Sequence, residues 1–240
     1  MKSLKILFVS VLCICLASTA EAQIKKKVQG DGNVQKETRD LSGFTGVKTS
    51  TAIDIYLTQG NSFSVVVEAD NNLLEYIETE VDNGVLKVYV DKVNITKSEK
   101  KVVHVTMKEI DLIKASSAGD VIGQTPVKAE ELKISTSSAG DVKLEVHVGK
   151  LYLSTSSSGD ITLKGEAEYL EASTSSAGDI KAYELTVKEA DVSASSAGDV
   201  KITVTERLIA RASSAGDVYY MGDPKYVDAK SSSAGDVVKK

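Results

Sequence analysis

The sequence is poor in the residues that most often carry chemistry. It contains no tryptophan, 2 histidines, 2 cysteines and 2 prolines among 240 residues, and aromatic side chains make up only 5% of it. So few imidazole and thiol groups argue against a His/Cys zinc site and against a Cys/His nucleophile. The formal net charge of −5 and the scarcity of aromatic rings argue against nucleic-acid binding, which needs a basic face or stacking platforms. A binding or structural role is therefore favoured over catalysis.

The first 22 residues have the organisation of a secretory signal peptide. A basic start at residues 1–5 precedes an apolar segment at residues 6–17, and the small-x-small pattern Ala20-Glu21-Ala22 follows. The apolar segment is too short to cross a bilayer as a helix. We therefore expect residues 1–22 to be removed on export. The mature protein is then not membrane-spanning and lies in the periplasm, on the outer-membrane surface or outside the cell.

Both cysteines, Cys13 and Cys15, fall inside this segment, directly after Leu12 and Ile14. Lipid attachment to a cysteine requires a small residue before it, so a lipoprotein is disfavoured. The predicted mature chain, residues 23–240, contains no cysteine and therefore no disulfide to stabilise it.

A six-residue motif, Ser-Ser-Ala-Gly-Asp-Val or a close variant, occurs seven times in the second half of the chain. Successive motif glycines are 21, 19, 19, 20, 18 and 19 residues apart. Such a fixed period is the signature of a repeat architecture in which each unit stacks on the next. The motif glycines are Gly119, Gly140, Gly159, Gly178, Gly198, Gly216 and Gly235.

Within each repeat, apolar and polar residues alternate with a period of two, which predicts β-strands with one buried face. The position eight residues before the motif glycine is mostly leucine, and the position two after it is always Val or Ile. The same residue type recurs at each position, which a parallel β-solenoid explains and a β-sandwich does not. We therefore predict an all-β, right-handed parallel β-solenoid with coils of about 19 residues.

The motif glycine has the parity of an inward-facing position. It either adopts a positive φ at a corner or lies where the backbone passes too close to the core for a Cβ atom. Residues 47–55 align with residues 113–121 and place Ile53 where glycine stands later. Because isoleucine does not tolerate positive φ, the inward interpretation is favoured, and residues 44–57 are predicted to be an eighth, degenerate coil. By the same parity, the serine two residues before each glycine should face the core and bond to the backbone.

The region between this coil and the regular repeats is predicted to close one end of the solenoid. Residues 62–70 and 85–90 are strand-like, and residues 71–81 are expected to form a short helix with Asn72 as its N-cap and with Leu73, Leu74 and Ile77 facing inward. A hairpin turn is expected at residues 82–84, and residues 102–107 lead the chain back. The predicted organisation is thus a segment at 23–38, a degenerate coil and cap at 39–107, and seven coils at 108–240, in one continuous domain from residue 39.

The last coil has no predicted cap. Lys239 and Lys240 would discourage edge pairing, but self-association through the open C-terminal coil is a further hypothesis.

The layout resembles a family of exported bacterial proteins described as auto-transporter adhesins with a head GIN domain. The resemblance extends over about residues 37–237 and implies a β-solenoid at or beyond the cell envelope, with no catalytic residues to assign. It rests on the motif coils and on residues 39–47 (RDLSGFTGV), 53–60 (IDIYLTQG), 65–73 (VVVEADNNL) and 84–88 (GVLKV).

If the coils stack, the aspartates that follow the motif glycines form an outward-facing row with a spacing of about 4.8 Å. The main interpretation is a turn ladder in which backbone N–H groups and Lys143, Lys181 and Lys201 compensate the negative charges. Two alternatives are a cation-binding stripe suited to Ca²⁺ and a strip that contacts a glycan or another surface, with Asp and Ser as hydrogen-bond partners. The candidate residues are Asp120, Asp141, Asp160, Asp179, Asp199, Asp217 and Asp236.

A catalytic role is not predicted. Seven equivalent aspartates share one environment, whereas an acid–base pair needs two different ones. His147 lies on the outward side of a strand, and His104 is the only other histidine. We expect an exported, adhesin-like protein that binds a surface glycan or an envelope or extracellular protein, without a cofactor. The alternative is a polysaccharide hydrolase or lyase on the same scaffold.

Overall fold

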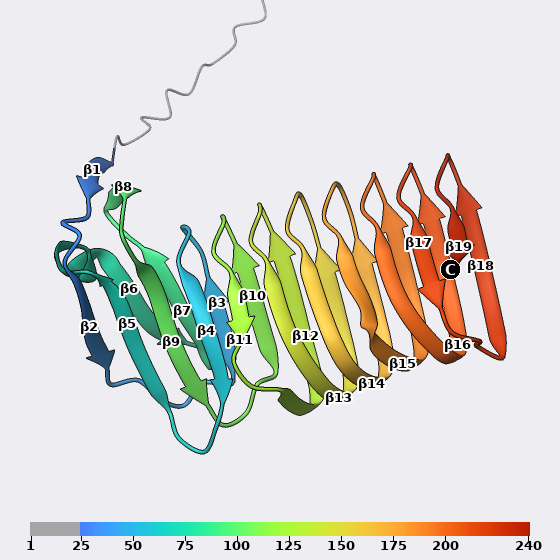
Figure 1. The fold of residues 1–240 in the computed structure, drawn as a ribbon, viewed down its shortest axis with the longest axis horizontal. Coiled ribbons are helices and arrows are strands. Elements are labelled where there is room, and N and C mark those ends of the chain that lie inside the picture. The colour runs from blue at the N-terminus through green and yellow to red at the C-terminus, as the bar shows by residue number, and fades with distance from the viewer. Residues whose placement is uncertain (1–24) are drawn as a thin grey trace, which may run out of the picture.

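The computed structural model describes residues 25–240, which form an elongated rod of β-strands (Figure 1). The predicted signal peptide and both cysteines lie outside the described residues. Within residues 25–240, no helix has the length and apolar character needed to cross a membrane.

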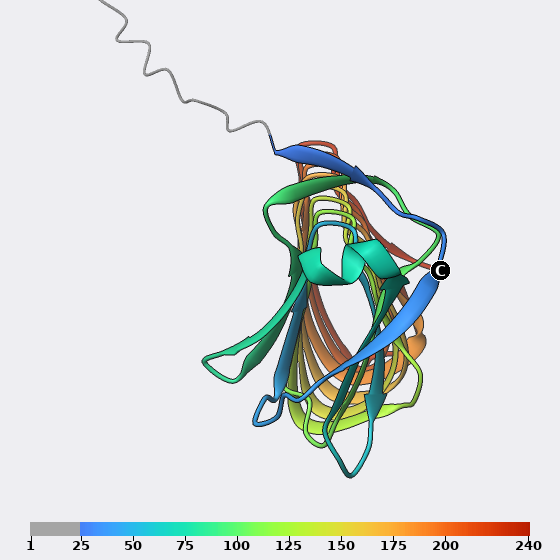
Figure 2. The same ribbon diagram turned by 90° about the vertical axis from the view of Figure 1, so that its left-hand side faces the viewer.

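The repeats form a stack of flattened coils. Each long strand leaves one motif, descends one face of the rod, bends at the far edge and climbs the other face to the next motif (Figures 1 and 2). We call the edge formed by the motifs the turn edge, the sheet that follows the motifs the downstream face, and the sheet that precedes them the upstream face. The strands are β10 (Leu112–Ser116), β11 (Val121–Gly123), β12 (Val127–Ser137), β13 (Val142–Thr155), β14 (Ile161–Thr174), β15 (Ile180–Ser195), β16 (Val200–Ser213), β17 (Val218–Met221), β18 (Tyr226–Ser232) and β19 (Val237–Lys239).

Equivalent residues of successive coils lie directly opposite one another. Leu132 pairs with Leu151, and Leu151 with Leu170, in parallel strands. All three side chains are fully buried, and each contributes about 2 kcal/mol by its removal from water. This register confirms the parallel solenoid and shows that the sandwich alternative is wrong.

The degenerate coil is also confirmed. Strands β3 (Gly46–Thr49) and β4 (Asp54–Gln59) pair in parallel with β10 and β11. Val47 lies opposite Ile113, and Ile55 lies opposite Val121, as the alignment of the two segments predicts. Ile53 is fully buried at the position of the motif glycine.

A cap closes the N-terminal end of the rod. One more parallel layer is added outside the degenerate coil, and antiparallel strands on both faces then end the stack. A short 3₁₀ helix, η1 (Asn71–Tyr76), lies across the end of the tube (Figure 2). In the parallel layer, β7 (Val85–Val90) pairs with β3, and β9 (Lys101–Met107) pairs with β4. In the antiparallel part, β5 (Ser64–Asp70) pairs with β9, β2 (Val34–Arg39) pairs with β5, and β6 (Ile77–Asp82) pairs with β7. Separately, β1 (Lys26–Gln29) pairs with β8 (Val93–Lys97).

The expected helix over residues 71–81 is wrong in its second half. Only Asn71–Tyr76 are helical, and Ile77–Asp82 form β6, because the alternating sequence IETEVD pairs with β7 across a two-residue turn. The turn residues Asn83 and Gly84 have φ values of 50° and 76°, which confirms the predicted hairpin. Leu73, Leu74 and Ile77 are buried, as expected.

Asn72 is not the N-cap of this helix. The N-cap residue is Asp70, and its side chain makes no capping hydrogen bond. The Asn72 side chain instead accepts a hydrogen bond from the N–H of Asp31 at 3.0 Å and donates one to the carbonyl of Gln29 at 2.9 Å. It therefore fastens the N-terminal segment to the cap.

Candidate binding surface

Each motif folds into a tight turn at the turn edge. In five of the seven copies, the second serine and the alanine both have positive φ, for example 52° at Ser117 and 59° at Ala118. The N–H of the motif glycine then donates to the carbonyl of the first serine, as from Gly140 to Ser137 at 3.1 Å. Positive φ at both central residues is the pattern of a type I′ turn.

These left-handed residues overturn the expectation for the second serine of the motif. The second serine itself has a positive φ in all seven copies, which interrupts the in–out alternation of the strand, so its side chain points to solvent instead of into the core. The exposed serines are Ser117, Ser138, Ser157, Ser176, Ser196, Ser214 and Ser233.

The motif glycines are required by close backbone approach, which confirms the inward interpretation. None of the seven has a positive φ, and all are buried. A Cβ atom added to Gly140 would lie 2.6 Å from the backbone nitrogen of Ser116, and one added to Gly178 would lie 2.7 Å from the carbonyl oxygen of Gly159. No larger residue fits between two successive motif turns of the seven regular coils.

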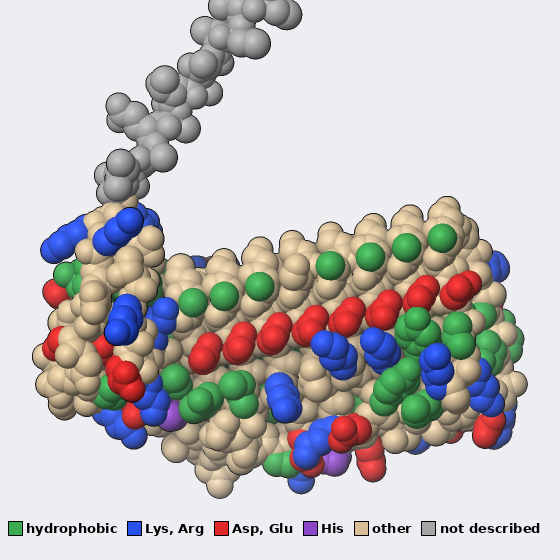
Figure 3. All heavy atoms as spheres, turned by 45° about the horizontal axis from the view of Figure 1, so that its top comes forward, with side chains coloured by type: hydrophobic (Ala, Val, Ile, Leu, Met, Phe, Trp, Pro, Cys, Tyr) green, Lys and Arg blue, Asp and Glu red, His purple; other side chains and the backbone are tan. Residues whose placement is uncertain are grey.

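The aspartates form one continuous row along the rod, visible as the red line in Figure 3. In six of the seven steps of the row, the Oδ1 atom of one aspartate accepts the backbone N–H of the aspartate in the next coil, at distances from 2.8 to 3.2 Å; the step from Asp199 to Asp217 lacks this bond. The row begins one coil earlier than predicted, because Asp54 accepts the N–H of Asp120. We call these residues the Asp row: Asp54, Asp120, Asp141, Asp160, Asp179, Asp199, Asp217 and Asp236.

Lysines neutralise part of this row. Lys181 lies 2.5 Å from Asp160 and 3.9 Å from Asp179, and Lys201 lies 3.3 Å from Asp199. Lys143 makes no ion pair with the row within the described residues. At the N-terminal end of the row, burial and the neighbouring charges of Asp54 and Asp141 raise the pKa of Asp120 despite the hydrogen bond from Asp141.

Buried threonines lie beneath the turns, four residues before the motif glycine. Thr155 donates to the Thr174 hydroxyl at 2.8 Å, and Thr174 donates to the carbonyl of Gly178. The hydroxyl of Thr136 is buried without a hydrogen-bond partner.

A groove of about 410 Å³ lies on the downstream face, below the Asp row. Its floor is formed by β13 and β14, where Lys143 lies opposite Thr162 and Glu145 opposite Lys164. One wall is the loop at residues 123–126, which accommodates the additional residues of the 21-residue interval. The other wall includes Glu184 in β15, at a bulge where the register with β14 shifts.

The charges of the groove lining are balanced, with two lysines and two glutamates beside apolar residues such as Leu144 and Leu163. Lys164 lies 3.0 Å from Glu145, and His147 lies 3.5 Å from it. Hydrogen bonding to Lys164, followed by the charge of that lysine and the contact with His147, lowers the pKa of Glu145. Glu145 is therefore a carboxylate near neutral pH, suited to accept hydrogen bonds from a ligand.

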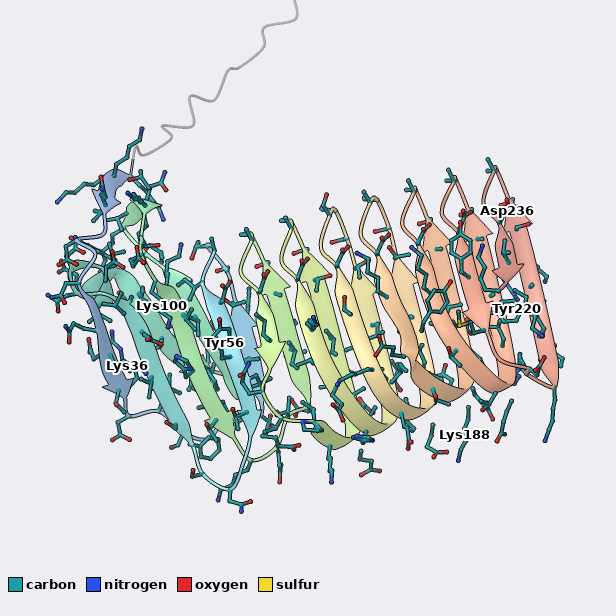
Figure 4. The ribbon with its side chains drawn as sticks, viewed as in Figure 1. Lys36, Tyr56, Lys100, Lys188, Tyr220 and Asp236 are labelled. Carbon is teal, nitrogen blue, oxygen red and sulfur yellow. The ribbon has the colours of Figure 1, made fainter. Side chains whose placement is uncertain are left out.

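The two histidines are far apart. His147 is partly exposed on the outward side of β13, as predicted. His104 lies in the cap, 2.7 Å from the buried Glu68, which also contacts Lys100 at 2.9 Å and Lys36 at 3.9 Å. Hydrogen bonds from His104 and Lys100 lower the pKa of Glu68 although burial opposes them. Lys36 and Lys100 mark this side of the cap in Figure 4.

Among residues 25–240, no three or more His, Cys, Asp or Glu side chains are arranged to hold a metal ion. Calcium binding to the Asp row stays a prediction. In most of these carboxylates, one of the two oxygens already accepts a backbone N–H group.

Two features escaped the sequence prediction. Asp54 was not assigned to the row although the alignment with Asp120 places it there. The groove had only one sequence signal, the 21-residue interval between Gly119 and Gly140, because its walls arise from departures from the repeat and not from the repeat itself.

Taken together, the fold and this surface define an all-β solenoid of the adhesin-like class. The sequence matches the family described as "Putative auto-transporter adhesin, head GIN domain" over residues 43–224, and the chain belongs to that family.

Solved structures support the same fold. A putative adhesin from Parabacteroides merdae is 26% identical, with a TM-score of 0.75 over 90% of this chain and 99% of that one. A putative adhesin from Bacteroides fragilis is 20% identical, with a TM-score of 0.82 over 89% of this chain and 100% of that one. A putative lipid binding protein from Parabacteroides distasonis is 22% identical, with a TM-score of 0.68 over 89% and 100% of the two chains. A comparison with curated proteins finds no match.

Proposed function

We propose that the protein is exported and acts at the cell envelope or surface as a non-enzymatic binding module, and that its groove holds an uncharged segment of a surface glycan. The adhesin-like family and neighbours support a role in surface contact. The observation that carries the choice of ligand is the balanced, hydrogen-bonding lining of the groove.

A glycan matches this lining better than a charged polymer does. Carboxylate, ammonium and hydroxyl groups alternate across the floor, as in Glu145, Lys164 and Thr162. Sugar hydroxyls both donate and accept hydrogen bonds, so they complement such a mixture. Two lysines and two glutamates leave no excess of either sign to attract an acidic or a basic ligand. Specific polar groups of this kind fix the orientation of a ligand in a concave site.

The test is a glycan-array screen of the mature chain, residues 23–240, followed by the variant Thr162→Arg. Thr162 faces outward in the centre of the groove floor, so an arginine there fills the groove without entering the core. The matched control is Ser154→Arg, an exposed outward position on the upstream face. We expect Thr162→Arg to weaken glycan binding at least tenfold and Ser154→Arg to leave it unchanged.

The absence of glycan binding, or equal binding by both variants, would contradict the proposed site. Repeating the screen with EDTA tests the Asp row separately: binding that depends on Ca²⁺ would support a cation stripe.

Export is tested by fractionating cells and sequencing the N-terminus of the protein, which we expect to begin at Gln23.

A further inference from the structure

The C-terminal end of the rod exposes residues whose equivalents in the preceding coils, from Leu132 onward, are buried. Val227, Ala229 and Ser231 of β18 are exposed, Val227 by 41%, whereas Leu208 and Ala210, which pair with the first two, are 0% exposed. Strand β18 pairs with β16 on one side, and no other described strand pairs with its outer edge. Tyr220 and Asp236 mark this end of the rod in Figure 4.

The two ends of the rod differ. On the upstream face, which carries β18, the N-terminal end is closed by β6, which runs antiparallel to β7, and η1 lies across the tube (Figure 2), so this end offers β18 no matching parallel edge. A head-to-tail filament is therefore disfavoured. An interface that uses the open end on both partners must be isologous, with a two-fold axis.

The sequence of β18 is complementary to itself in one antiparallel register. When two copies of YVDAKSS pair about Ala229, Asp228 lies opposite Lys230 of the partner subunit, and this happens twice. Registers centred on Asp228 or on Lys230 would place like charges opposite each other, which is destabilising. On the inner side, Val227 lies opposite Ser231 of the partner subunit and the two Ala229 side chains meet.

We propose that β18 pairs antiparallel with β18 of a second copy, so that two rods join end to end as a two-fold dimer. Pairing of the backbone edges satisfies groups that are otherwise open, as in strand addition to an exposed sheet edge. A two-fold axis normal to the sheet at Ala229 keeps the upstream face continuous from one copy to the other. This proposal does not depend on the proposed glycan function.

The negative charge of Asp228, which favours this register, is present in the single copy. The Nη2 atom of Arg211 donates a hydrogen bond to the Oδ2 atom of Asp228 over 2.7 Å. Hydrogen bonding to Arg211 lowers the pKa of Asp228 although burial opposes it. Asp228 is therefore ionised near neutral pH, and its Oδ1 atom makes no described hydrogen bond and is free to accept one from Lys230 of the partner subunit.

The test measures mass against concentration for the mature chain, by analytical ultracentrifugation over the micromolar range. We expect a reversible shift from the mass of one copy to that of two. Asp228→Lys and Lys230→Asp each bring like charges together in the dimer and should raise its dissociation constant at least tenfold. The matched control is Lys133→Asp, an exposed outward position in the middle of the rod.

A charge exchange distinguishes the proposed register from a general effect on folding. Mixing the Asp228→Lys and Lys230→Asp proteins should restore a dimer, since each then meets the opposite charge, and the double variant D228K/K230D should dimerise by itself. Urea unfolding of each variant shows whether it is folded. A single-copy mass at every concentration would overturn the proposal, as would a dimer indifferent to both reversals or a failure of the folded variants to complement each other.

Discussion

The backbone N–H of Asp160 donates a hydrogen bond to Oδ1 of Asp141 in the preceding coil, over 2.9 Å. The same bond occurs in six of the seven steps of the row, so aspartates whose charges repel one another are also joined by hydrogen bonds. Two carboxylates about 4.8 Å apart repel by roughly 0.9 kcal/mol in water, while a hydrogen bond to a charged acceptor contributes about 1.5–3 kcal/mol. The ladder is therefore favourable overall, and the N–H groups that stabilise it come from the next coil and not from the same turn.

The first prediction concerns this ladder. Asp160→Ala removes the acceptor of the Asp179 N–H and the partner of Lys181. We expect it to lower the free energy of unfolding by about 1–2 kcal/mol. Asp160→Asn keeps an oxygen and should cost less than about 0.5 kcal/mol, because it also removes like-charge repulsion.

Urea denaturation measures both values. The control is Asp191→Ala, which removes an exposed aspartate of the upstream face that lies outside the row. Equal losses for the alanine variants at 160 and 191 would show that the ladder contributes nothing specific.

The second prediction contrasts two adjacent residues of one turn. A Cβ on Gly198 would lie 2.7 Å from the carbonyl oxygen of Gly178, so Gly198→Ala should destabilise the protein by about 2 kcal/mol or more. Ala197 has a φ of 68°, and Ala197→Gly should stabilise it by about 0.5 kcal/mol, because relief of left-handed strain exceeds the added backbone entropy of the unfolded chain. Thermal unfolding of the two variants should give shifts of opposite sign, and a destabilised Ala197→Gly would contradict the turn geometry.

The third prediction uses the threonines under the turns. Thr136→Val removes a buried hydroxyl that has no partner, and we expect unchanged or slightly higher stability, by up to about 1 kcal/mol. Thr174→Val is the matched control, because its hydroxyl donates to the carbonyl of Gly178, and it should lose about 1 kcal/mol. If Thr136→Val instead lowers the free energy of unfolding as much as Thr174→Val, the hydroxyl of Thr136 has a partner after all.

The fourth prediction is acid sensitivity of the cap. Burial raises the pKa of Asp70, but hydrogen bonds from the backbone N–H groups of Lys100, Gly32 and Glu99 outweigh it, so its pKa lies below the ordinary value of 3.8. A carboxyl group with a lowered folded pKa contributes stability that is fully present above the unfolded value and is lost as the pH falls through the folded value.

We therefore expect the Asp70 contribution to be complete at pH 5 to 7 and to decline below about pH 4. Asp70→Asn removes this ionisation, so the fall in unfolding free energy between about pH 4 and 2 should be smaller than in the unmodified protein. Asp40→Asn, at an exposed aspartate, serves as the control. Parallel pH profiles for all three proteins would mean that Asp70 does not provide this dependence.

The sequence by itself determined the repeating part of this protein. Period-two alternation and the return of leucine at positions such as Leu132, Leu151 and Leu170 require stacked strands, because only stacking buries one dry face per coil. It also determined that the motif glycine faces inward, since Ile53 replaces it in the degenerate coil. These conclusions depend on local chemistry repeated in register, which a single sequence displays in full.

Tertiary structure alone decided what departs from the repeat. Residues 77–81 join a hairpin instead of a helix because β7 offers them a partner strand. The second serine of each motif points outward because its own left-handed backbone conformation, present in all seven copies, interrupts the alternation. The groove walls depend on the loop at residues 123–126 and on the bulge at Glu184. The inner side of β18 is exposed because no further described strand pairs with its outer edge. Such relations arise from long-range contacts, so no local pattern in the sequence carries them.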